Sequence, residues 1–499
     1  MKVLLVLPPT AEKPSYAEPP AGLLYVGSAL KRAGHAVTVL DIYRHHRSPE
    51  ELLQLVRDEQ YEVLGFGGIT TCYGYVKEAS LLIRKNLPTV HLIAGGVLSS
   101  TYELLLQHTA IDVVCRAEGE LTAVNVVNRL AEGRRVFDDI RGVAFLQEGK
   151  VVKSLPQPYI ENLDDIPIPD YELLDMDEYA FDAMKDPFFS IEPSCRSFYR
   201  PGMRVFNLKT ARGCTNACTF CYRHFAGYRQ HSIEYVIRHI RRLQERYNVH
   251  FIRFGDELFT RDKAWILEFT KRLVAESITI KYIIHGVRTD NVDRELMLAL
   301  KNSGCVTVFI GFESGSQKIL NVMRKNVALE TNIAAVRTIL DSGLNVLVQT
   351  VIGMPSEDHK TIAETIDSLI RSGVSPEWLS INYTQAYPGT WLWQHAIKTG
   401  MIVNTEQYLI DLGRSNALLL NYTDVPLSET RKWSALIYDS VLKAKNRKAT
   451  GLFDKIITSD LRLYRFTLSL RRYGMVTTLM NSAGYLYRLI HGRVFRERF

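Results

Sequence analysis

The sequence predicts an α/β protein made of two alternating strand–helix regions followed by a helical C-terminal part. Continuous apolar runs alternate with segments of helical spacing over residues 1–135, which is typical of a parallel sheet covered on both faces. The alternation resumes with longer periods over residues 205–400. With 499 residues, the chain is also longer than one hydrophobic core usually organises, so several domains are expected.

The first region, residues 1–135, is predicted to be a doubly wound domain of the Rossmann-like or flavodoxin-like kind. Its predicted strands are Val3–Leu7, Val37–Ile42, Val63–Gly68, His91–Ala94 and Val113–Arg116. Its predicted helices are Gly22–Arg32, Pro49–Asp58, Tyr75–Lys85, Thr101–His108 and Leu121–Leu130.

Ligands of such sheets bind beyond the carboxyl ends of the strands. The candidate binding loops are therefore Pro8–Gly22, Gly67–Tyr75, Gly95–Ser100 and Glu118–Thr122. An alternative is that the glycines of these loops only form turns. No Gly-x-Gly-x-x-Gly follows the first strand, which argues against a dinucleotide ligand.

Residues 136–204 are expected to connect the two regions. Val143–Phe145 and Val151–Lys153 flank Glu148-Gly149, which predicts a hairpin. The acidic, proline-rich stretch 162–170 is expected to run extended.

The second region, residues 205–400, is predicted to be a (βα)6 partial barrel of the TIM type. Its strands are expected at Val205–Ala211, His250–Phe254, Ile280–His285, Thr307–Gly311, Val346–Val351 and Leu379–Tyr383. Helices are expected at Ser232–Tyr247, Arg261–Ala275, Val292–Asn302, Asn332–Ser342 and Lys360–Arg371. Chemistry in barrels lies at the C-terminal ends of the strands, where Asp256, Glu257, Arg288 and Glu313 fall.

Residues 401–499 are expected to be mostly helical, with an amphipathic stretch at Thr430–Lys443. The net charge of +7 comes from residues 462–499, which hold eight arginines and one acid, Glu497. Three interpretations remain: a packed helical subdomain with a solvated basic face, an interfacial helix on anionic lipid, or a site for nucleic acid or an acidic partner. The last is least favoured, because no nucleic-acid motif accompanies the charge.

The strongest chemical signal is Cys214-x₃-Cys218-x₂-Cys221. Three thiolates on one loop can hold three irons of a [4Fe-4S] cluster and leave the fourth iron open. One alternative is a zinc site completed by His224 or His231, and another is a chance cluster of thiols.

The other four cysteines, Cys72, Cys115, Cys195 and Cys305, are predicted to be small core residues. An odd, sparse set of seven cysteines is no disulfide framework and fits a reducing cytoplasm. The sequence contains no run of about 18 or more apolar residues, so no membrane-spanning helix is predicted.

Residues 1–400 resemble the radical S-adenosylmethionine (SAM) enzymes that carry an N-terminal cobalamin-binding domain, most strongly in the cysteine loop with Phe220. The resemblance implies that Phe220 and Tyr222 lie near the nucleoside. It implies that Gly255-Asp256-Glu257 holds the SAM amino group, with Asp256 replacing a glycine of the family. It further implies that Arg288 pairs with the SAM carboxylate, Glu313 binds the ribose hydroxyls and Gly353 lies near adenine.

The segments Pro19–Leu24, Gly95-Gly96 and Arg116–Glu120 resemble loops of the family's cobalamin domain. The cobalamin contacts expected from this resemblance are Thr70, Thr71, Gly95, Gly96, Glu118, Gly119 and Glu120. No Asp-x-His-x-x-Gly signature is present, and none of the thirteen histidines has an aspartate two residues before it. The expectation is therefore base-off cobalamin without a histidine ligand.

The resemblance implies that the cluster cleaves SAM to a 5′-deoxyadenosyl radical, and that a cobalamin-dependent methyl transfer to an unactivated carbon follows. A second hypothesis is radical cyclisation, rearrangement or oxidation, as in anaerobic tetrapyrrole cyclases, with no methyl donated by cobalamin. A third is a cobalamin- and cluster-based sensor or scaffold. S-adenosylhomocysteine with 5′-deoxyadenosine would indicate the first, 5′-deoxyadenosine alone the second, and neither product the third.

The partners expected are a small-molecule or lipid-like substrate and a reductant such as flavodoxin or ferredoxin. The expected location is the cytoplasm, and the tail interpretation on anionic lipid adds peripheral membrane contact. Nucleic acid is not expected.

Overall fold

The computed structural model describes residues 1–10, 18–45, 47–116, 118–414 and 418–447. The chain divides into two compact units. The first comprises Met1–Ala180, Lys209–Ile240 and Thr384–Leu420, and the second comprises Phe181–Leu208, Arg241–Tyr383 and Asn421–Phe499. The arginine-rich tail at 462–499 lies outside the described residues.

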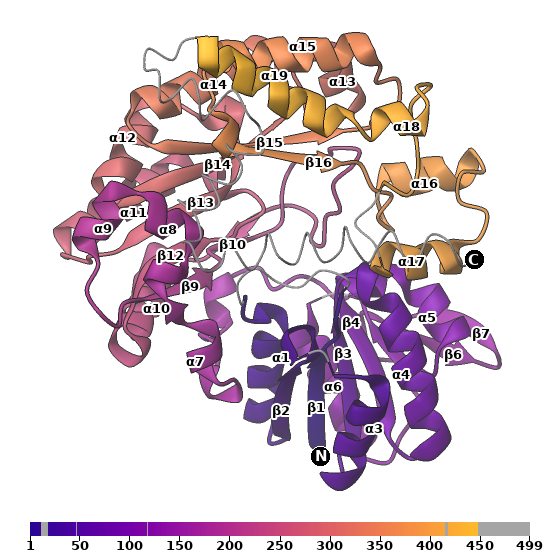
Figure 1. Ribbon diagram of the computed structural model, residues 1–499. Helices are drawn as coiled ribbons and strands as arrows, with labels where there is room; N and C mark the ends of the chain where they lie inside the picture. Colours follow the sequence, from indigo (N-terminus) through magenta and orange to yellow (C-terminus); the bar gives the residue numbers. More distant parts are fainter. Residues whose placement is uncertain (11–17, 46, 117, 415–417, 448–499) are drawn as a thin grey trace, which may run out of the picture. The chain divides into compact units, whose positions relative to one another are not determined.

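The first unit contains a seven-stranded sheet with the order β2-β1-β3-β4-β5-β6-β7 (Figure 1). Its strands are β1 Lys2–Leu7, β2 Ala36–Asp41, β3 Val63–Gly68, β4 His91–Gly96, β5 Val113–Cys115, β6 Val143–Gln147 and β7 Lys150–Lys153. The first five strands are parallel in the order 2-1-3-4-5, so the flavodoxin-like prediction is confirmed. The hairpin expected in the connector is present, but β6 pairs antiparallel with β5 and extends this sheet.

Helices cover the sheet, with α1 beside α6 and α3 beside α4 (Figure 1). They are α1 Ala21–Arg32, α2 Ile42–His45, α3 Pro49–Asp58, α4 Tyr73–Asn86, α5 Tyr102–His108 and α6 Gly119–Ala131. Short 3₁₀ turns, η1 Thr70–Cys72 and η2 Val97–Thr101, follow β3 and β4. The strand positions Val3, Val63 and Val113 are fully buried in the core beneath α1 and α6, which is the burial that continuous apolar runs predict.

Within the stretch 162–170, expected to be extended, Leu163–Asp165 forms a 3₁₀ turn, η3, while residues 167–170 form neither helix nor strand. Two further short turns follow it, η4 Tyr171–Leu173 and α7 Met176–Tyr179. The side chains of Asn162, Asp170 and Asp175 accept backbone N–H groups at their starts, which explains the local curvature. The first unit also holds β10 Ala211–Arg212, β11 Arg229–Gln230, α16 Trp391–Lys398 and α17 Thr405–Arg414.

The second unit contains a sheet with the order β16-β15-β14-β13-β12-β9-β8. Its strands are β8 Phe181–Asp182, β9 Arg204–Leu208, β12 Val249–Phe254, β13 Lys281–Arg288, β14 Cys305–Glu313, β15 Asn345–Ile352 and β16 Leu379–Tyr383. Six of these strands are parallel, as expected for the partial barrel, and the short β8 adds an antiparallel edge.

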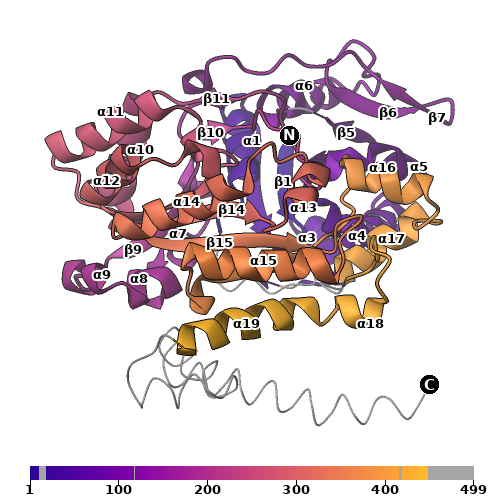
Figure 2. The same cartoon turned by 90° about the horizontal axis from the view of Figure 1, so that it is seen from above.

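Helices follow the parallel strands in alternation: α10 Ile233–Tyr247, α11 Lys263–Ala275, α12 Arg294–Asn302, α13 Gln317–Val322, α14 Leu329–Asp341 and α15 His359–Ser372. After β16 the chain adds α18 Leu427–Thr430 and α19 Trp433–Arg447, and α19 lies alongside α15 (Figure 2). Further 3₁₀ turns are η5 Ala183–Lys185, η6 Phe259–Arg261, η7 Thr289–Asn291 and η8 Pro376–Trp378.

One face of the second sheet packs against α8 Pro187–Ile191 and α9 Pro193–Phe198. Phe188 and Phe189 of α8 pack there with Phe251 and Phe309 of the strands. The side chain of Arg253 is buried at this face beside Asp186, which caps α8.

The four cysteines outside the loop, Cys72, Cys115, Cys195 and Cys305, are buried, as expected for core residues. Burial raises the pKa of Cys72 and Cys115 to about 12, so these thiols stay protonated. Among the helices that the structure describes, none combines the length and apolar character needed to cross a bilayer.

Candidate functional site

The three-cysteine segment forms the loop of a short hairpin in the first unit. The sequence predicted one strand running to Ala211, but β9 ends at Leu208 and β10 pairs instead with β11. This antiparallel pair closes the loop at its base. Gly213 has φ +86°, and a Cβ there would lie 2.5 Å from the carbonyl oxygen of Gly227. Only glycine fits this closure, because the other residues would meet the backbone across the loop.

The thiols of this loop are open to solvent to different degrees: Cys214 and Cys218 are half-buried and Cys221 is exposed. The Asn216 side-chain amide donates to the sulfur of Cys214 at 3.4 Å, and the Cys221 N–H donates to the carbonyl of Cys218 at 3.3 Å. Within the described residues, no three His, Cys, Asp or Glu side chains converge as a cage for a single ion. A [4Fe-4S] cluster does not require three side chains to converge on a single ion, because each thiolate binds a separate iron.

Of the two histidines of the zinc alternative, His231 is hydrogen-bonded elsewhere, whereas His224 makes a ring contact. His231 contacts Asp164 through Nδ1 at 3.1 Å, and its ring stacks on Tyr235 at 3.9 Å. His224 packs against Phe225. Burial lowers the pKa of both histidines to about 4. These contacts favour a structural role for His231, whereas the buried Nδ1 of His224 has no hydrogen-bond partner among the described residues.

Two further segments of the first unit meet the cysteine loop. Gly389, with φ +89°, lies so close to the ring of Tyr222 that a Cβ would be 2.9 Å from its Cε2 and 4.0 Å from Cβ of Ser100. The N–H of Leu392, in α16, donates to the carbonyl of Thr219 at 3.3 Å. The loop is thus in contact with the segment after β16, and Ser100, from the turn after β4, lies beside the same glycine.

The carboxyl edge of the first sheet carries hydroxyls and closely packed backbone. The buried hydroxyls of Thr71 and Ser100 have no hydrogen-bond partner in the part of the chain described. Thr70 is buried as well. At the ends of β3 and β4, a Cβ on Gly96 would lie 3.2 Å from the carbonyl oxygen of Gly68, while Gly95 has only ordinary contacts, to Cys115. This edge therefore offers buried hydroxyls with unused hydrogen-bonding capacity.

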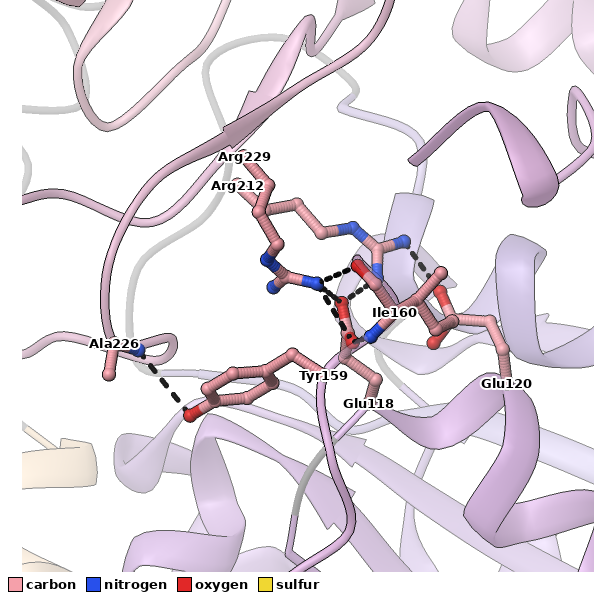
Figure 3. A network of polar contacts seen from close by, with 7 residues as sticks. All are labelled: Glu118, Glu120, Tyr159, Ile160, Arg212, Ala226 and Arg229. Atoms are coloured by element: carbon pink, nitrogen blue, oxygen red, sulfur yellow. Dashed lines mark hydrogen bonds and ion pairs between the residues drawn. The ribbon is translucent and has the colours of Figure 1, made fainter. Parts of the chain in front are cut away.

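Glu118 and Glu120, after β5, point toward Arg212 and Arg229 at the base of the cysteine loop (Figure 3). Gly119 lies between them and begins α6, where a Cβ would meet Val26 of α1 at 2.7 Å. Sequence reasoning missed both arginines.

In the second unit, Gly255, Asp256 and Glu257 follow β12. Asp256 is buried and Glu257 is exposed. Gly286 of β13, with φ +67°, approaches this turn so closely that a Cβ would lie 2.4 Å from the carbonyl oxygen of Asp256. The bulge at Gly286 thereby supports the turn.

Arg288 and Glu313 end the neighbouring strands β13 and β14. The Arg288 guanidinium donates to both carboxylate oxygens of Asp290, at 2.9 and 2.8 Å, and to the carbonyl of Lys325 at 2.9 Å. The buried ammonium of Lys325 donates to Glu313 at 2.8 Å. Gly311 makes room for this pair, because a Cβ there would lie 2.4 Å from Glu313 Oε1 and 2.8 Å from Lys325 Nζ.

Glu313 also has φ +63°, a backbone conformation that non-glycine residues rarely adopt. Strain of this kind, held beside a buried ion pair, is typical of a binding site. Lys325 was missed by sequence reasoning, since it follows a short helix and belongs to no periodic pattern.

Gly353 begins the turn after β15, with φ +88°. Its N–H and that of Met354 both donate to Oε2 of Glu357, which is buried. Burial raises the pKa of Glu357 to about 7, although the two N–H groups favour its charged form. Glu357 thus shapes the turn that contains Gly353.

Comparison with known proteins places both regions in described families. Residues 208–369 match the family model of the radical SAM superfamily, and residues 9–127 match the B12 binding domain. The chain is 30% identical over 413 residues to "Uncharacterized methyltransferase PH0819" of Pyrococcus horikoshii, covering 81% of this chain and 84% of that protein.

Another relative is the anaerobic magnesium-protoporphyrin IX monomethyl ester cyclase of Synechocystis, 27% identical over 68% of this chain and 66% of its own length. Among solved structures, the radical SAM methyltransferase TsrM of Kitasatospora setae superposes with a TM-score of 0.63 over 81% of this chain and 77% of its own, at 18% identity.

The fold and the two matches define a radical SAM protein with an N-terminal B12-binding domain. This chain belongs to that family, the radical SAM enzymes of the cobalamin-dependent group. The two domains imply a [4Fe-4S] cluster with SAM and cobalamin, as the sequence predicted.

The residues present fit these groups. The three thiols suit an iron–sulfur cluster, and the unpartnered hydroxyls of Thr71 and Ser100 suit a ligand rich in amides. The side chains of Arg288 and Glu313, at the ends of neighbouring strands, carry both signs of charge, which suits a zwitterion.

Proposed function

We propose that this enzyme transfers a methyl group to an unactivated carbon of its substrate, in a reaction that uses both SAM and cobalamin. The observation that carries the proposal is the contact, within the first unit, between the cysteine loop and the B12-type fold: Glu118 and Glu120 of that fold bind the base of the loop. Methyl transfer needs both cofactors close together. In addition, the relative PH0819, whose alignment covers 81% of this chain, is named a methyltransferase.

In this proposal Cys214, Cys218 and Cys221 hold the cluster, and Phe220 and Tyr222 lie against the nucleoside of SAM. Asp256 and Glu257 hold the amino group of SAM with Gly255, Arg288 pairs with its carboxylate, Glu313 binds the ribose and Gly353 lies near adenine.

The geometry of the second unit supports these roles. Lys325 holds Glu313 by an ion pair, Asp290 orients the guanidinium of Arg288, and Glu357 fixes the turn at Gly353. Side chains held in this way need little reordering when a ligand binds, which favours tight and specific binding.

For cobalamin, we propose the hydroxyls of Thr70 and Thr71, the backbone at Gly95 and Gly96, and the loop from Glu118 to Glu120. When bound, the cluster and SAM supply homolytic chemistry and cobalamin supplies the methyl group. The chain itself binds, orients and keeps water from the reacting atoms.

A second candidate is an oxidative or cyclising reaction in which cobalamin gives no methyl group. The relation to the magnesium-protoporphyrin cyclase, over 68% of this chain, favours it. The two candidates differ in products, because methyl transfer also consumes SAM as a methyl donor.

The test is anaerobic purification with iron and cobalamin supplied, followed by incubation with SAM, a strong reductant and candidate substrates. Methyl transfer predicts S-adenosylhomocysteine and 5′-deoxyadenosine together, in comparable amounts. 5′-Deoxyadenosine without S-adenosylhomocysteine would contradict it and indicate the second candidate. Neither product, with both cofactors bound, would indicate a sensor or scaffold.

The cluster assignment is tested with one cysteine variant and a matched control variant. Replacing Cys214, Cys218 and Cys221 by alanine should abolish iron binding and 5′-deoxyadenosine formation. The Cys195→Ala variant, which removes a thiol buried in α9, should keep both. 5′-Deoxyadenosine from the triple variant would refute the cluster assignment.

A radical SAM enzyme also requires a reductant and a substrate, and we propose flavodoxin or ferredoxin for the first. For the second we propose a small or lipid-like molecule, because eight arginines in residues 462–499 suit contact with anionic lipid from the cytoplasmic side.

A further inference from the structure

The base of the cysteine loop contains an electrostatic conflict. In the β10–β11 pair, Ala211 lies opposite Gln230 and Arg212 lies opposite Arg229. Like charges directly opposite in an antiparallel pair are destabilising. A two-residue ladder also has little stability of its own. The hairpin that shapes the cysteine loop therefore needs support from outside itself.

Two carboxylates of the B12-type fold resolve the conflict. Glu118 accepts from Arg212 at 2.7 Å and from Arg229 at 2.9 and 3.0 Å, so one carboxylate bridges both guanidinium groups. Glu120 accepts from the other terminal nitrogen of Arg212 at 2.5 Å (Figure 3). With two positive and two negative charges, the set is neutral.

This set is closed off from water. The side chain of Glu118 is 1% exposed, that of Glu120 8%, and those of both arginines 14%. Aromatic rings cover the guanidinium groups: Arg212 lies over Tyr25 and Phe225, and Arg229 over Tyr159 and Phe225. Removing one member of a buried ionic set leaves an uncompensated charge, which is strongly destabilising.

The two acids lie where the ligand of a doubly wound fold is expected. Glu118 precedes α6 and Glu120 lies in its first turn, beyond the carboxyl end of β5. The backbone N–H of Ile160 also donates to Glu118, at 2.6 Å. A ligand that fixes the conformation of this loop therefore also fixes the positions of the two carboxylates. The carboxylates in turn hold the β10–β11 hairpin in place.

We propose that Glu118, Glu120, Arg212 and Arg229 are positioning residues that couple cobalamin binding to assembly of the cluster. The proposal rests on the proposed cofactors: cobalamin contacts the loop from Glu118 to Glu120, while the two carboxylates of this loop bind the arginines of the hairpin. Coupling between two sites is reciprocal: cobalamin binds more tightly to cluster-loaded protein, and the cluster is held more tightly when cobalamin is bound.

The test measures binding, not turnover. The dissociation constant of hydroxocobalamin is measured on full-length protein with and without a reconstituted cluster, and the ratio of the two constants is the coupling factor. Wild type should give a factor of about 5 or more, within the usual range for coupled sites. The Glu118→Gln variant should give a factor near one.

Three further variants sharpen the result. Glu59→Gln breaks the exposed pair with Lys2 in the same unit and should keep the wild-type factor. Arg229→Lys keeps the charge but loses the planar guanidinium group that lies over Tyr159 and Phe225, and should lower the factor even if Glu118→Gln does not fold. In the double variant Glu118→Gln with Arg229→Gln, the remaining pair of Arg212 and Glu120 is neutral, so the protein should take up iron while the factor stays near one.

A factor of one in wild type with both cofactors bound, or an unchanged factor in Glu118→Gln or Arg229→Lys, would overturn the proposal. Recovery of the wild-type factor in the double variant would overturn it too, because the residues would then only stabilise the fold. Failure of the proposed function looks different: wild type would take up no cluster or no cobalamin.

Discussion

Arg253 and Asp186 form an ion pair that is nearly removed from water, with side chains 2% and 0% exposed. Asp186 also accepts the N–H groups of Phe188 and Phe189, so it caps α8 while it neutralises the arginine. One side chain thus joins the strand β12 to the helix that covers its face.

We expect Arg253→Met to destabilise the second unit by about 3–5 kcal/mol, because it leaves the Asp186 carboxylate buried without its counter-charge. The measurement is the midpoint of urea unfolding. The control is Arg241→Met, which breaks a largely exposed pair with Glu276 and should change the midpoint little. Equal shifts for the two variants would contradict this account.

Glu357 predicts a pH dependence of stability. Burial raises its pKa to about 7 from the ordinary 4.5, so folding favours the protonated form. Its stabilisation is complete below the unfolded pKa and is lost as the pH rises through the folded pKa. The loss amounts to about 3 kcal/mol, at about 1.4 kcal/mol for each pKa unit.

Wild type should therefore lose stability between pH 5 and pH 8 relative to Glu357→Gln, which does not titrate. The quantity to measure is the difference in melting temperature between the two proteins across this range. An exposed carboxylate that pairs with a lysine, removed in the Glu268→Gln variant, serves as the control and should give a nearly constant difference. A difference for Glu357→Gln that does not change with pH would be inconsistent with the raised pKa.

At the scale of elements, the β10–β11 hairpin decides the shape of the cysteine loop. We expect Gly213→Ala to prevent iron uptake while the rest of the chain folds, because the new Cβ would lie 2.5 Å from the carbonyl oxygen of Gly227. The measurement is iron and sulfide per chain after anaerobic reconstitution, with circular dichroism as the check on folding.

Gly133→Ala is the matched control. Gly133 also has a positive φ, of +73°, but a Cβ there would have nothing within 4 Å. It therefore carries the conformational strain without the steric clash, and iron uptake should remain. Normal iron content in Gly213→Ala would show that the loop closes in another way.

The sequence predicted the elements better than it predicted their partners. Apolar runs and helical spacing located the parallel strands of both sheets, since burial on both faces leaves a strong local signal. The pairing of β6 with β5 and of β10 with β11 left no such signal, because it depends on residues distant in the chain. For this reason the strand predicted to run to Ala211 was too long, since β9 ends at Leu208.

At the scale of the whole molecule, cobalamin and SAM should each stabilise the folded protein. A ligand that binds only the native state stabilises it by about 2.7 kcal/mol at a hundredfold excess over its dissociation constant. We expect the melting temperature to rise with hydroxocobalamin and, separately, with SAM on cluster-loaded protein. Differential scanning calorimetry measures this, and adenosine 5′-monophosphate serves as a control nucleotide. No rise with saturating hydroxocobalamin would contradict cobalamin binding.

By itself, the sequence determined the family and the chemistry. The spacing of Cys214, Cys218 and Cys221 is local, and the ends of successive strands can be read from periodicity. Tertiary structure alone decided what surrounds these groups: Lys325 beside Glu313, and the carboxylates of Glu118 and Glu120 between two opposed arginines. Such contacts join residues up to 111 positions apart, and a charge finds its distant partner only when the chain is folded.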